Sequence, residues 1–407
     1  MLLELAWRNI WRNRKRTAIL LVAVVIGIWS MIFLGALMRG IADQMVTNGI
    51  DTLTGHVAVQ ERGYHEDPAI ENRIADPGPV RAVLEKNLPP GSRWTARVRV
   101  PAVVATARHS TGLTLVGIDP ETEKTVSFLG KAMHSGRYLE EGDTGGILVG
   151  DALLERMETR IGHRLVLMSQ DTGGEIASRS FTITGTFRGE MESTEKSFVF
   201  VNGKAAREML KMGDAVSEFS VILPREGETE KVAALLRRKL AGESLDVLTW
   251  KERLPLVSAV LSLYDQFIFL WYVVVFVAMG FGLVNTILMA VFERMREFGL
   301  LKALGMRPRG IVGEVLMEAL VILGIGAAAG NVLGILSVLA LKTRGIDLSS
   351  VAAGSEYAGL GRAIFPSLAG TDLLLANAVV FVLGAVVSLY PAFRAARFTP
   401  VRALAKT

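Results

Sequence analysis

The stretch Glu293–Arg309, which reads ERMREFGLLKALGMRPR, decides how this chain folds. It lies between two uncharged runs, Gln266–Phe292 and Ala319–Leu341. Each run exceeds the roughly 20 apolar residues that a helix needs to cross a bilayer. The stretch is therefore predicted to be a short loop between two membrane spans.

The same stretch has the pattern of a surface helix. Apolar side chains recur at every third position, and charged side chains crowd its beginning. This pattern predicts a short amphipathic helix near the membrane surface. Gly305 and Pro308 should end it, because glycine adopts the left-handed cap and proline cannot continue a helix. An ordinary interfacial helix with a basic rim has the same composition, so composition leaves its function open.

The overall composition is that of a membrane protein with a large polar insert. The chain has 407 residues, 50% of them hydrophobic, and its mean hydropathy is +0.37. Four uncharged runs are long enough to span a bilayer: Thr17–Met38, Gln266–Phe292, Ala319–Leu341 and Leu373–Phe393. We expect an α-helical membrane protein with four transmembrane helices and a large α+β extracytoplasmic domain between helices 1 and 2. The sequence has no cysteine, which excludes disulfides and thiolate metal sites.

The distribution of lysine and arginine predicts the topology. Basic residues cluster before the first span, between the second and third, and after the fourth. These segments, and with them both termini, should face the cytoplasm. The remaining polar part is mildly acidic, and no basic and aromatic stripe supports nucleic-acid binding. Met1–Arg16 does not resemble a cleaved signal peptide, because the apolar run after it is too long for one and no A-x-A cleavage site follows. Trp7, Ile10 and Trp11 on one face predict an interfacial helix there.

Three motifs together resemble one family. The opening reads LAWRNIWRNRKRT, the pattern E-R-x-R-E-x-G-x-L-K-A-L-G follows the second span, and the chain closes with YPAFRAARFTPVRALA. They resemble the FtsX-like, MacB-type permeases of ABC transporters, which include the cell-division permease, macrolide and peptide exporters, and lipoprotein-releasing permeases. The LolC/LolE-like lipoprotein-releasing branch is the most similar. The resemblance implies a bacterial inner-membrane protein with a MacB-like periplasmic core domain.

The resemblance also implies partners and a coupling site. In this family the helix after the second span docks into a cleft on a cytoplasmic ABC-type ATPase, which binds ATP and magnesium. The implied partners are two copies of that ATPase, a second permease subunit (the same chain or a paralogue) and membrane lipid. The candidate ATPase-coupling residues are Glu293, Arg294, Arg296, Glu297, Phe298, Leu300, Leu301, Lys302, Leu304 and Gly305.

The expected segments follow in a fixed order. They are a cytoplasmic amphipathic helix (1–16), a first span (17–40) that continues as a stalk to about residue 50, a two-lobed extracytoplasmic domain (51–253), a stalk and second span (254–292), a coupling helix (293–312), a third span (313–341), an extracytoplasmic loop (342–372), a fourth span (373–393) and a cytoplasmic tail (394–407).

The polar insert is predicted to form two lobes. Both ends of the insert, including strand Arg97–Ala107, should build one α+β lobe, and the middle, Thr114–Lys211, the other. The run Leu115–Pro120 resembles the exterior domain of lipoprotein-releasing permeases. In one such subunit a hairpin at the position of Gln170–Glu175 recruits a soluble periplasmic carrier, so a carrier is a candidate partner, although this tip is short and polar.

The preferred function is extraction or export of a lipoprotein or lipid-like substrate from the membrane, driven by a separate ATPase. A substrate cavity between the first two spans is expected at Leu34, Met38, Phe267, Leu270 and Val274. Export of a peptide or antibiotic is one alternative. A transducer that regulates a cell-wall hydrolase is another, although its exterior domain usually has a single lobe.

No enzymatic motif is found in the sequence. The string G-x-x-x-x-G-K-[ST] does not occur, so this chain is not expected to hydrolyse ATP alone, and no cofactor is predicted for it. The five histidines show no metal-binding spacing, and G-x-S-x-G does not occur. Within the spans, Asn285 and Asn331 are predicted to form interhelical hydrogen bonds, and Gly326 and Gly330 to allow close helix packing.

Overall fold

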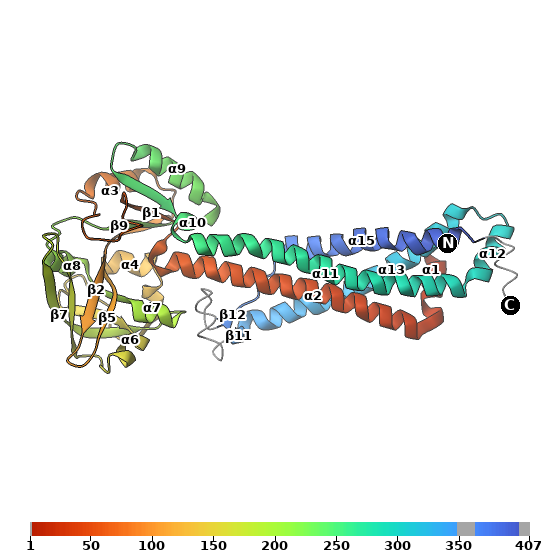
Figure 1. Cartoon of the computed structure of the whole chain (residues 1–407), viewed down its shortest axis with the longest axis horizontal. Coiled ribbons are helices and arrows are strands. Elements are labelled where there is room, and N and C mark those ends of the chain that lie inside the picture. Colours follow the sequence, from red (N-terminus) through yellow and green to blue (C-terminus); the bar gives the residue numbers. More distant parts are fainter. Residues whose placement is uncertain (1, 348–362, 399–407) are drawn as a thin grey trace. The chain divides into compact units, whose positions relative to one another are not determined.

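The computed structural model describes residues 2–347 and 363–398, with the side chains of Leu2, Leu3, Leu5 and Asp265 excepted. The closing motif beyond Phe398 lies outside these residues. The chain divides into two compact units. We call residues 1–43, 261–347 and 363–407 the helical unit, and residues 44–260 the sheet unit (Figure 1).

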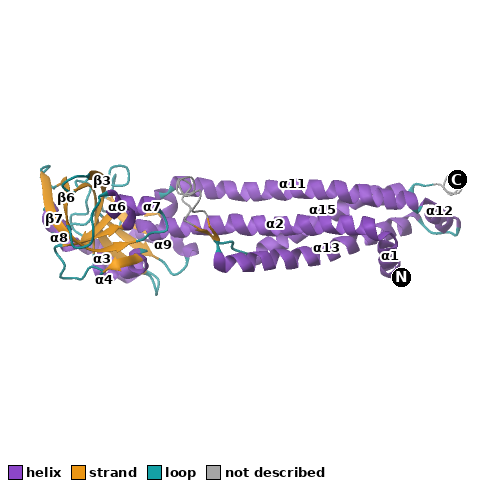
Figure 2. Cartoon of the chain, turned by 90° about the horizontal axis from the view of Figure 1, so that it is seen from below, coloured by secondary structure: helices purple, strands orange, loops and turns teal. Residues whose placement is uncertain are grey.

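Long apolar helices build the helical unit (Figure 2). Its elements are α1 (Leu2–Ile10), η1 (Trp11–Asn13), α2 (Arg14–Gly49), α11 (Pro255–Glu293), α12 (Met295–Ala303), α13 (Pro308–Arg344), β11 (Ile346–Asp347), β12 (Ala363–Ile364) and α15 (Gly370–Ala396). Among the described residues, four helices are long and apolar enough to cross a membrane: Ala6–Thr54, Pro255–Glu293, Pro308–Arg344 and Gly370–Ala396. The predicted fold class is confirmed.

Two of these helices are longer than a bilayer requires. Helix α2 has 36 residues and α11 has 39. At a rise of about 1.5 Å per residue each exceeds 50 Å, against roughly 30 Å of hydrocarbon. Both helices therefore continue past the apolar layer, and both pass from the helical unit into the sheet unit.

Small residues set the packing of α13. A Cβ atom built on Gly330 would lie 2.8 Å from Ile28 Cβ, and one on Gly334 would lie 2.9 Å from Ile32 Cγ2, so α2 and α13 approach at glycine positions. Gly326 likewise faces Val24 of α2. The predicted close packing at the glycine pair is confirmed.

The two intramembrane asparagines differ. Asn331 Nδ2 donates to Asn377 Oδ1 at 2.8 Å, and Asn377 Nδ2 donates back at 2.9 Å, which joins α13 to α15. Asn285 is exposed on α11, and no hydrogen bond of its side chain is found among the described residues. The prediction for Asn331 is confirmed, whereas that for Asn285 is wrong for this chain alone, because its helix face turns away from the neighbouring helices.

The sheet unit contains the strands of one large sheet. They are β1 (Val57–Glu61), β2 (Arg93–Ala105), β3 (Ser110–Ile118), β4 (Met133–Gly136), β5 (Gly146–Gly150), β6 (Arg164–Gln170), β7 (Ile176–Phe187), β8 (Phe198–Asn202), β9 (Glu218–Ile222) and β10 (Leu245–Thr249). The helices are η2 (Ile50–Thr54), α3 (Gly78–Asn87), α4 (Pro120–Val126), α5 (Leu129–Ala132), α6 (Asp151–Arg156), α7 (Glu192–Ser197), α8 (Gly203–Leu210), η3 (Glu226–Glu228), α9 (Thr229–Lys239) and α10 (Trp250–Arg253).

Six strands of the sheet unit pair in a closed ring. The order is β2, β3, β8, β5, β7 and β6, and β6 pairs again with β2. Alternate side chains of these strands, including Val100, Leu115 and Phe181, gather in one buried apolar cluster. Closure leaves these strands without a free edge, which removes a common route to edge-to-edge association.

Strand β2 belongs to both lobes. Its first half pairs with β9 in the lobe β10–β1–β9, which α3 and α9 cover, and its second half pairs with β3 and β6 in the ring. The sequence interpretation placed this strand in one lobe only. A strand of 13 residues is long enough to serve two sheets, and alternation of side chains does not indicate its partners.

Candidate functional site

The site begins where α11 ends. Helix α11 stops at Glu293, Arg294 leaves the helical conformation, and α12 runs over Met295–Ala303. Gly305 has φ +95°, which glycine adopts without steric strain, and its N–H donates to Lys302 O at 3.0 Å. Pro308 then opens α13 at its first turn. The expected helix and its glycine end are both present.

Arg294 is the central residue of this site. Its Nε donates to Glu297 Oε2 and its Nη1 to Glu318 Oε2, both at 3.0 Å, and its Nη2 donates to Glu314 Oε1. The guanidinium also lies 4.9 Å from the centre of the Phe298 ring. Arg294 is 6% exposed, so one buried cation joins the start of α12 to two acidic residues of α13. We call these five residues the Arg294 cluster.

The N-terminal segment joins the same cluster. Asn9 Nδ2 donates to Glu314 Oε1 at 3.2 Å, and Arg12 Nη1 donates to Glu297 Oε1 at 2.6 Å. Arg16 pairs with Glu293 at the end of α11. The segment before the first span therefore holds α12 from one side.

Lys302 attaches the other end of α12 to the end of α15. Its Nζ donates to Phe398 O at 2.8 Å and to Ala396 O. These carbonyl groups lie at and just beyond the C-terminal end of α15, where a cation is favoured by the helix dipole. Helix α12 is thus fixed at both ends to other helices of its unit.

These hydrogen bonds set the pKa directions of Glu297 and Arg294. Burial alone would raise the pKa of Glu297, but hydrogen bonds from Arg294 and Arg12 outweigh it and hold that pKa below its ordinary value. Burial would lower the pKa of Arg294, whereas its carboxylate partners raise it. Both groups therefore stay charged at neutral pH.

The predicted coupling residues divide into two sets. Arg294 and Phe298 are buried inside the chain, and Leu301 and Lys302 are half-buried, so these residues position α12. The exposed residues are Glu293, Arg296, Glu297, Leu300, Leu304 and Gly305. Leu300 is 54% exposed and Leu304 76%, and with Arg296 they repeat at intervals of four on one helix face. We call Arg296, Leu300 and Leu304 the α12 face.

Residues that the sequence interpretation missed are Asn9, Arg12, Glu314 and Glu318. A signal was present, because two carboxylates one turn apart at the start of an apolar helix require a cation nearby. The sequence did not show which basic residue would be that cation.

The predicted substrate-cavity residues differ in exposure. Leu34 and Met38 are half-buried on α2. Phe267, Leu270 and Val274 are all more than half exposed, on the face of α11 opposite its buried side chains. Contact of these residues with a substrate stays a prediction.

The hairpin tip predicted near Gln170–Glu175 is present between β6 and β7. Asp171 Oδ1 accepts hydrogen bonds from Gly173 N at 2.8 Å and Glu175 N at 3.0 Å, and Lys211 Nζ lies 2.6 Å from Asp171 Oδ2. The tip is therefore tied back to the end of α8. This geometry does not test whether the hairpin recruits a soluble carrier, so carrier binding stays a prediction.

The fold and the site together define a class of protein: a membrane protein whose first two long helices flank a two-lobed sheet unit. The MacB-like periplasmic core domain family matches residues 17–239, more than half of the chain, and the FtsX-like permease C-terminal family matches residues 269–400. The chain belongs to the FtsX-like permeases that carry a MacB-like periplasmic core domain. The family predicted from the three motifs is confirmed.

Individual relatives have low sequence identity to this chain, but their alignments cover more than half of it. The macrolide export ATP-binding/permease protein MacB of Wolinella succinogenes is 24% identical and aligns with 99% of this chain and 60% of its own length. The pyoverdine export ATP-binding/permease protein PvdT of Pseudomonas fluorescens is 24% identical, with 99% and 59% covered. The lipoprotein-releasing system transmembrane protein LolC of Neisseria meningitidis is 22% identical, with 58% of each chain covered. This chain thus spans 58 to 60% of the length of these relatives.

Proposed function

We propose that this chain is the permease subunit of an ABC transporter of the mechanotransmission type. It lies in the bacterial inner membrane with both termini in the cytoplasm, and it acts with two copies of a separate ATPase and a second permease subunit. ATP and magnesium are bound by that ATPase. Closure of the ATPase pair pushes α12, and the motion passes along α2 and α11 to the sheet unit.

The attachment of α12 carries this proposal. A helix that transmits force must not rotate against its neighbours, and α12 is held by Arg294 at one end and Lys302 at the other. Its outward face still presents two exposed leucines, which suit a groove on a partner protein. A loop helix without a partner gains nothing from exposing Leu304 to water.

The proposed substrate is a lipoprotein or lipid-like molecule taken from the membrane. The exposed apolar face of α11 at Phe267, Leu270 and Val274 supports this substrate class, because acyl chains bind apolar surfaces. Export of a small molecule is a second candidate, supported by the names of the two relatives that align with 99% of this chain.

Co-purification tests the proposed coupling. The tagged chain is isolated from its native membranes in mild detergent as wild type, as Leu300→Asp/Leu304→Asp, and as Ile176→Asp. Ile176 is an exposed apolar residue of the sheet unit and provides the matched control. We expect an ABC-type ATPase with the wild type and the control and little with the double variant. Equal recovery of the ATPase with all three proteins would refute the claim that the α12 face contacts it. Recovery of no ATPase with any of them would refute the proposed function.

ATP hydrolysis by the recovered complex separates the two substrate classes. In nanodiscs, a triacylated lipopeptide should stimulate hydrolysis if the substrate is a lipoprotein. Stimulation by a macrolide, with no response to the lipopeptide, would favour small-molecule export instead.

A further inference from the structure

A buried ion cluster lies where the two lobes of the sheet unit share β2. Arg97 donates to both oxygens of Glu123 at 3.0 and 2.8 Å, and Arg253 Nη2 donates to Glu218 Oε2 at 2.8 Å. Arg99 Nη1 lies 3.9 Å from Glu218 Oε1. Among the described residues, these two carboxylates are the only acidic partners within 4 Å of the three guanidinium groups. The cluster therefore carries one unmatched positive charge.

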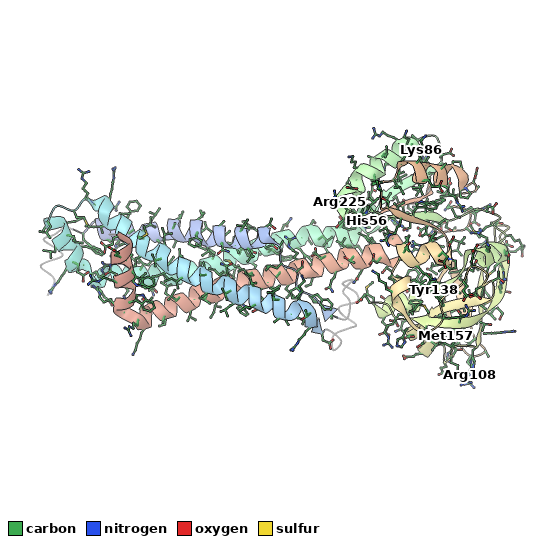
Figure 3. All side chains as sticks on the ribbon, turned by 180° about the vertical axis from the view of Figure 1, so that it is seen from behind. His56, Lys86, Arg108, Tyr138, Met157 and Arg225 are labelled. Carbon is green, nitrogen blue, oxygen red and sulfur yellow. The ribbon has the colours of Figure 1, made fainter. Side chains whose placement is uncertain are left out.

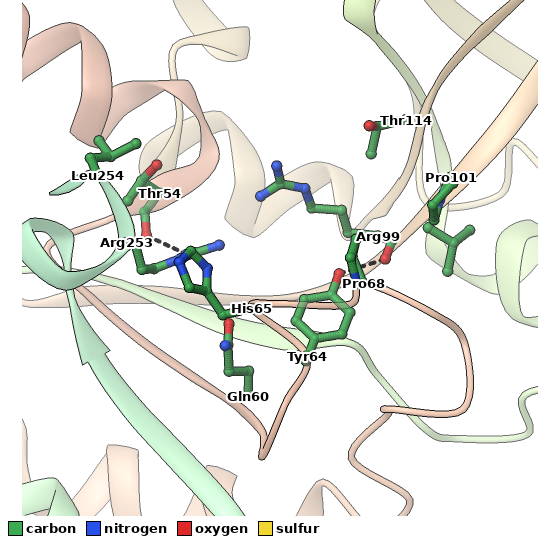
Figure 4. A pocket seen from close by; sticks show the side chains of 11 residues that line it. Thr54, Gln60, Tyr64, His65, Pro68, Arg99, Pro101, Thr114, Arg253 and Leu254 are labelled. Atoms are coloured by element: carbon green, nitrogen blue, oxygen red, sulfur yellow. Dashed lines mark hydrogen bonds between the residues drawn. The ribbon is translucent and has the colours of Figure 1, made fainter. Parts of the chain in front are cut away.

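A cavity of about 220 Å³ opens beside this cluster. Gln60, Tyr64, His65, Arg99 and Arg253 line it, as Figure 4 shows. The Gln60 side chain is fully buried, and neither its amide nitrogen nor its amide oxygen has a hydrogen-bond partner within the described part of the chain. Leaving such an amide unpaired in the interior costs free energy unless a further group occupies the cavity.

The unmatched charge of the cluster is positive, although its buried atoms without partners among the described residues include two acceptors, Gln60 Oε1 and Glu218 Oε1, as well as donors. Arg253 Nε is buried and, within the described residues, also has no acceptor. Burial lowers the pKa of Arg253, and the neighbouring Arg99 and Arg97 lower it further, against the effect of Glu218. The Arg99 guanidinium contacts the Phe198 ring at 5.6 Å and donates no hydrogen bond that we find in the described residues. These groups need an acceptor that carries negative charge.

We propose that this cavity binds a small anion through carboxylate, phosphate or sulfate oxygens. Arg99, Arg253 Nε and the Gln60 amide nitrogen donate to the anion, and its charge balances the cluster. Guanidinium groups match the geometry of such oxygens, and hydrogen bonds between charged groups are stronger than neutral ones. This ligand site lies in the sheet unit and goes beyond the proposed ATPase coupling.

The same arginines hold the ends of the two long helices. Arg97 Nη1 donates to Leu53 O at 2.6 Å, and Arg253 Nη1 donates to Thr54 O at 2.9 Å. Leu53 has φ +66°, an uncommon conformation for leucine that these hydrogen bonds stabilise. Arg253 itself directly precedes Leu254 and α11. A bound anion would therefore strengthen the point where α2 ends and α11 begins.

Anion binding to the full chain in detergent tests the proposal. Inorganic phosphate, sulfate and acetate are titrated by calorimetry against a constant chloride background. The wild type is compared with Arg99→Gln, Gln60→Leu and the control Arg108→Gln. The Arg108 side chain is exposed between β2 and β3, two strands of the closed ring (Figure 3). Melting followed by tryptophan fluorescence shows whether each variant is folded.

We expect saturable binding of at least one probe at one site per wild-type chain. Arg99→Gln should weaken it by roughly 10-fold or more, since a hydrogen bond to a charged group is lost, and Arg108→Gln should leave it unchanged. Gln60→Leu should weaken binding and, without anion, raise the melting temperature. No saturable binding of any probe would mean that the cavity holds only water, and equal binding by the Arg99 and Arg108 variants would mean an adventitious ion only. Either result overturns the proposal.

Discussion

Replacing Arg294 by methionine should destabilise the helical unit severely. Methionine keeps much of the apolar contact with Phe298 but removes the only buried cation of the Arg294 cluster in the described part of the chain. The side chains of Glu314 and Glu318 are 4% and 15% exposed, so water cannot compensate the lost charge. Removing one partner of a buried ion pair costs about 3–5 kcal/mol. We expect a loss of free energy of unfolding in that range.

A compensating variant separates charge from packing. Adding Glu314→Gln and Glu318→Gln to Arg294→Met removes the uncompensated carboxylates, while the hydrogen bonds that Arg294 donated remain absent. The triple variant should recover at least half of the loss and keep a deficit of about 1–2 kcal/mol, which corresponds to the missing hydrogen bonds. Non-additivity of this size is typical of residues in direct contact.

The free energy is measured by unfolding the purified chain in mixed micelles. Tryptophan fluorescence follows the transition, and Trp7 and Trp11, which lie beside Asn9 and Arg12 in sequence, are two of the six tryptophans that contribute to it. A loss below about 1 kcal/mol for Arg294→Met would show that the cluster is not an anchor. Additive effects in the triple variant would show that the three residues do not interact. Either outcome would refute our account of how α12 is held.

Three further predictions follow from packing and charge. Gly330→Val should cost about 1–3 kcal/mol in the same unfolding assay, because its Cβ would lie 2.8 Å from Ile28 Cβ; no loss would mean that α2 and α13 can separate freely. Asn331→Leu should cost about 0.5–2 kcal/mol and Asn331→Leu/Asn377→Leu less than the single change, whereas equal costs would exclude the paired amides. Burial would raise the pKa of Glu218, but Arg253, Arg99 and Arg97 hold it below 4.5, so this carboxylate stabilises the sheet unit above that pH and progressively less below it. Glu218→Gln should lower the melting temperature at pH 7 and flatten its fall below pH 4.5; an unchanged acid profile would contradict the assignment.

The helices could be predicted from the sequence because their signals are local. An uncharged run of sufficient length predicts a span wherever it occurs, and a glycine such as Gly305 predicts the end of a helix by its own conformational freedom. The attachment of α12 could not be predicted in this way. Arg294 lies beside other charged residues in sequence and was interpreted as a residue that contacts the ATPase, yet two of its three carboxylate partners come from α13. Asn9 and Arg12, which contact Glu314 and Glu297, come from the first 16 residues.

The sheet unit shows the same distinction between local and distant signals. Two lobes could be predicted because strands and a helix recur at both ends of the insert, while the middle, Thr114–Lys211, is long enough for a second lobe. The shared strand could not, since pairing of β2 with β9 on one side and with β6 on the other joins residues far apart in sequence. Arg97 within that strand resembles a solvent-facing residue, and only the fold shows it 1% exposed against Glu123.

Helix faces inside the membrane were the hardest feature to predict, and the reason is physical. Lipid is as apolar as leucine, so hydrophobicity does not distinguish a packed face from a lipid-facing one. Phe267 and Leu270 were assigned to a substrate cavity from their position near the outer ends of the spans; α11 exposes them, and their contact with a substrate stays a prediction. Asn285 and Asn331 both lie in apolar spans, yet within the described residues a side-chain partner is found for Asn331 and not for Asn285. Residue size is the more informative signal, because a glycine such as Gly330 lies where another helix comes close enough to exclude a side chain. By that criterion the face of α13 toward α2 could have been assigned from sequence, while the large side chains of α11 give no such indication.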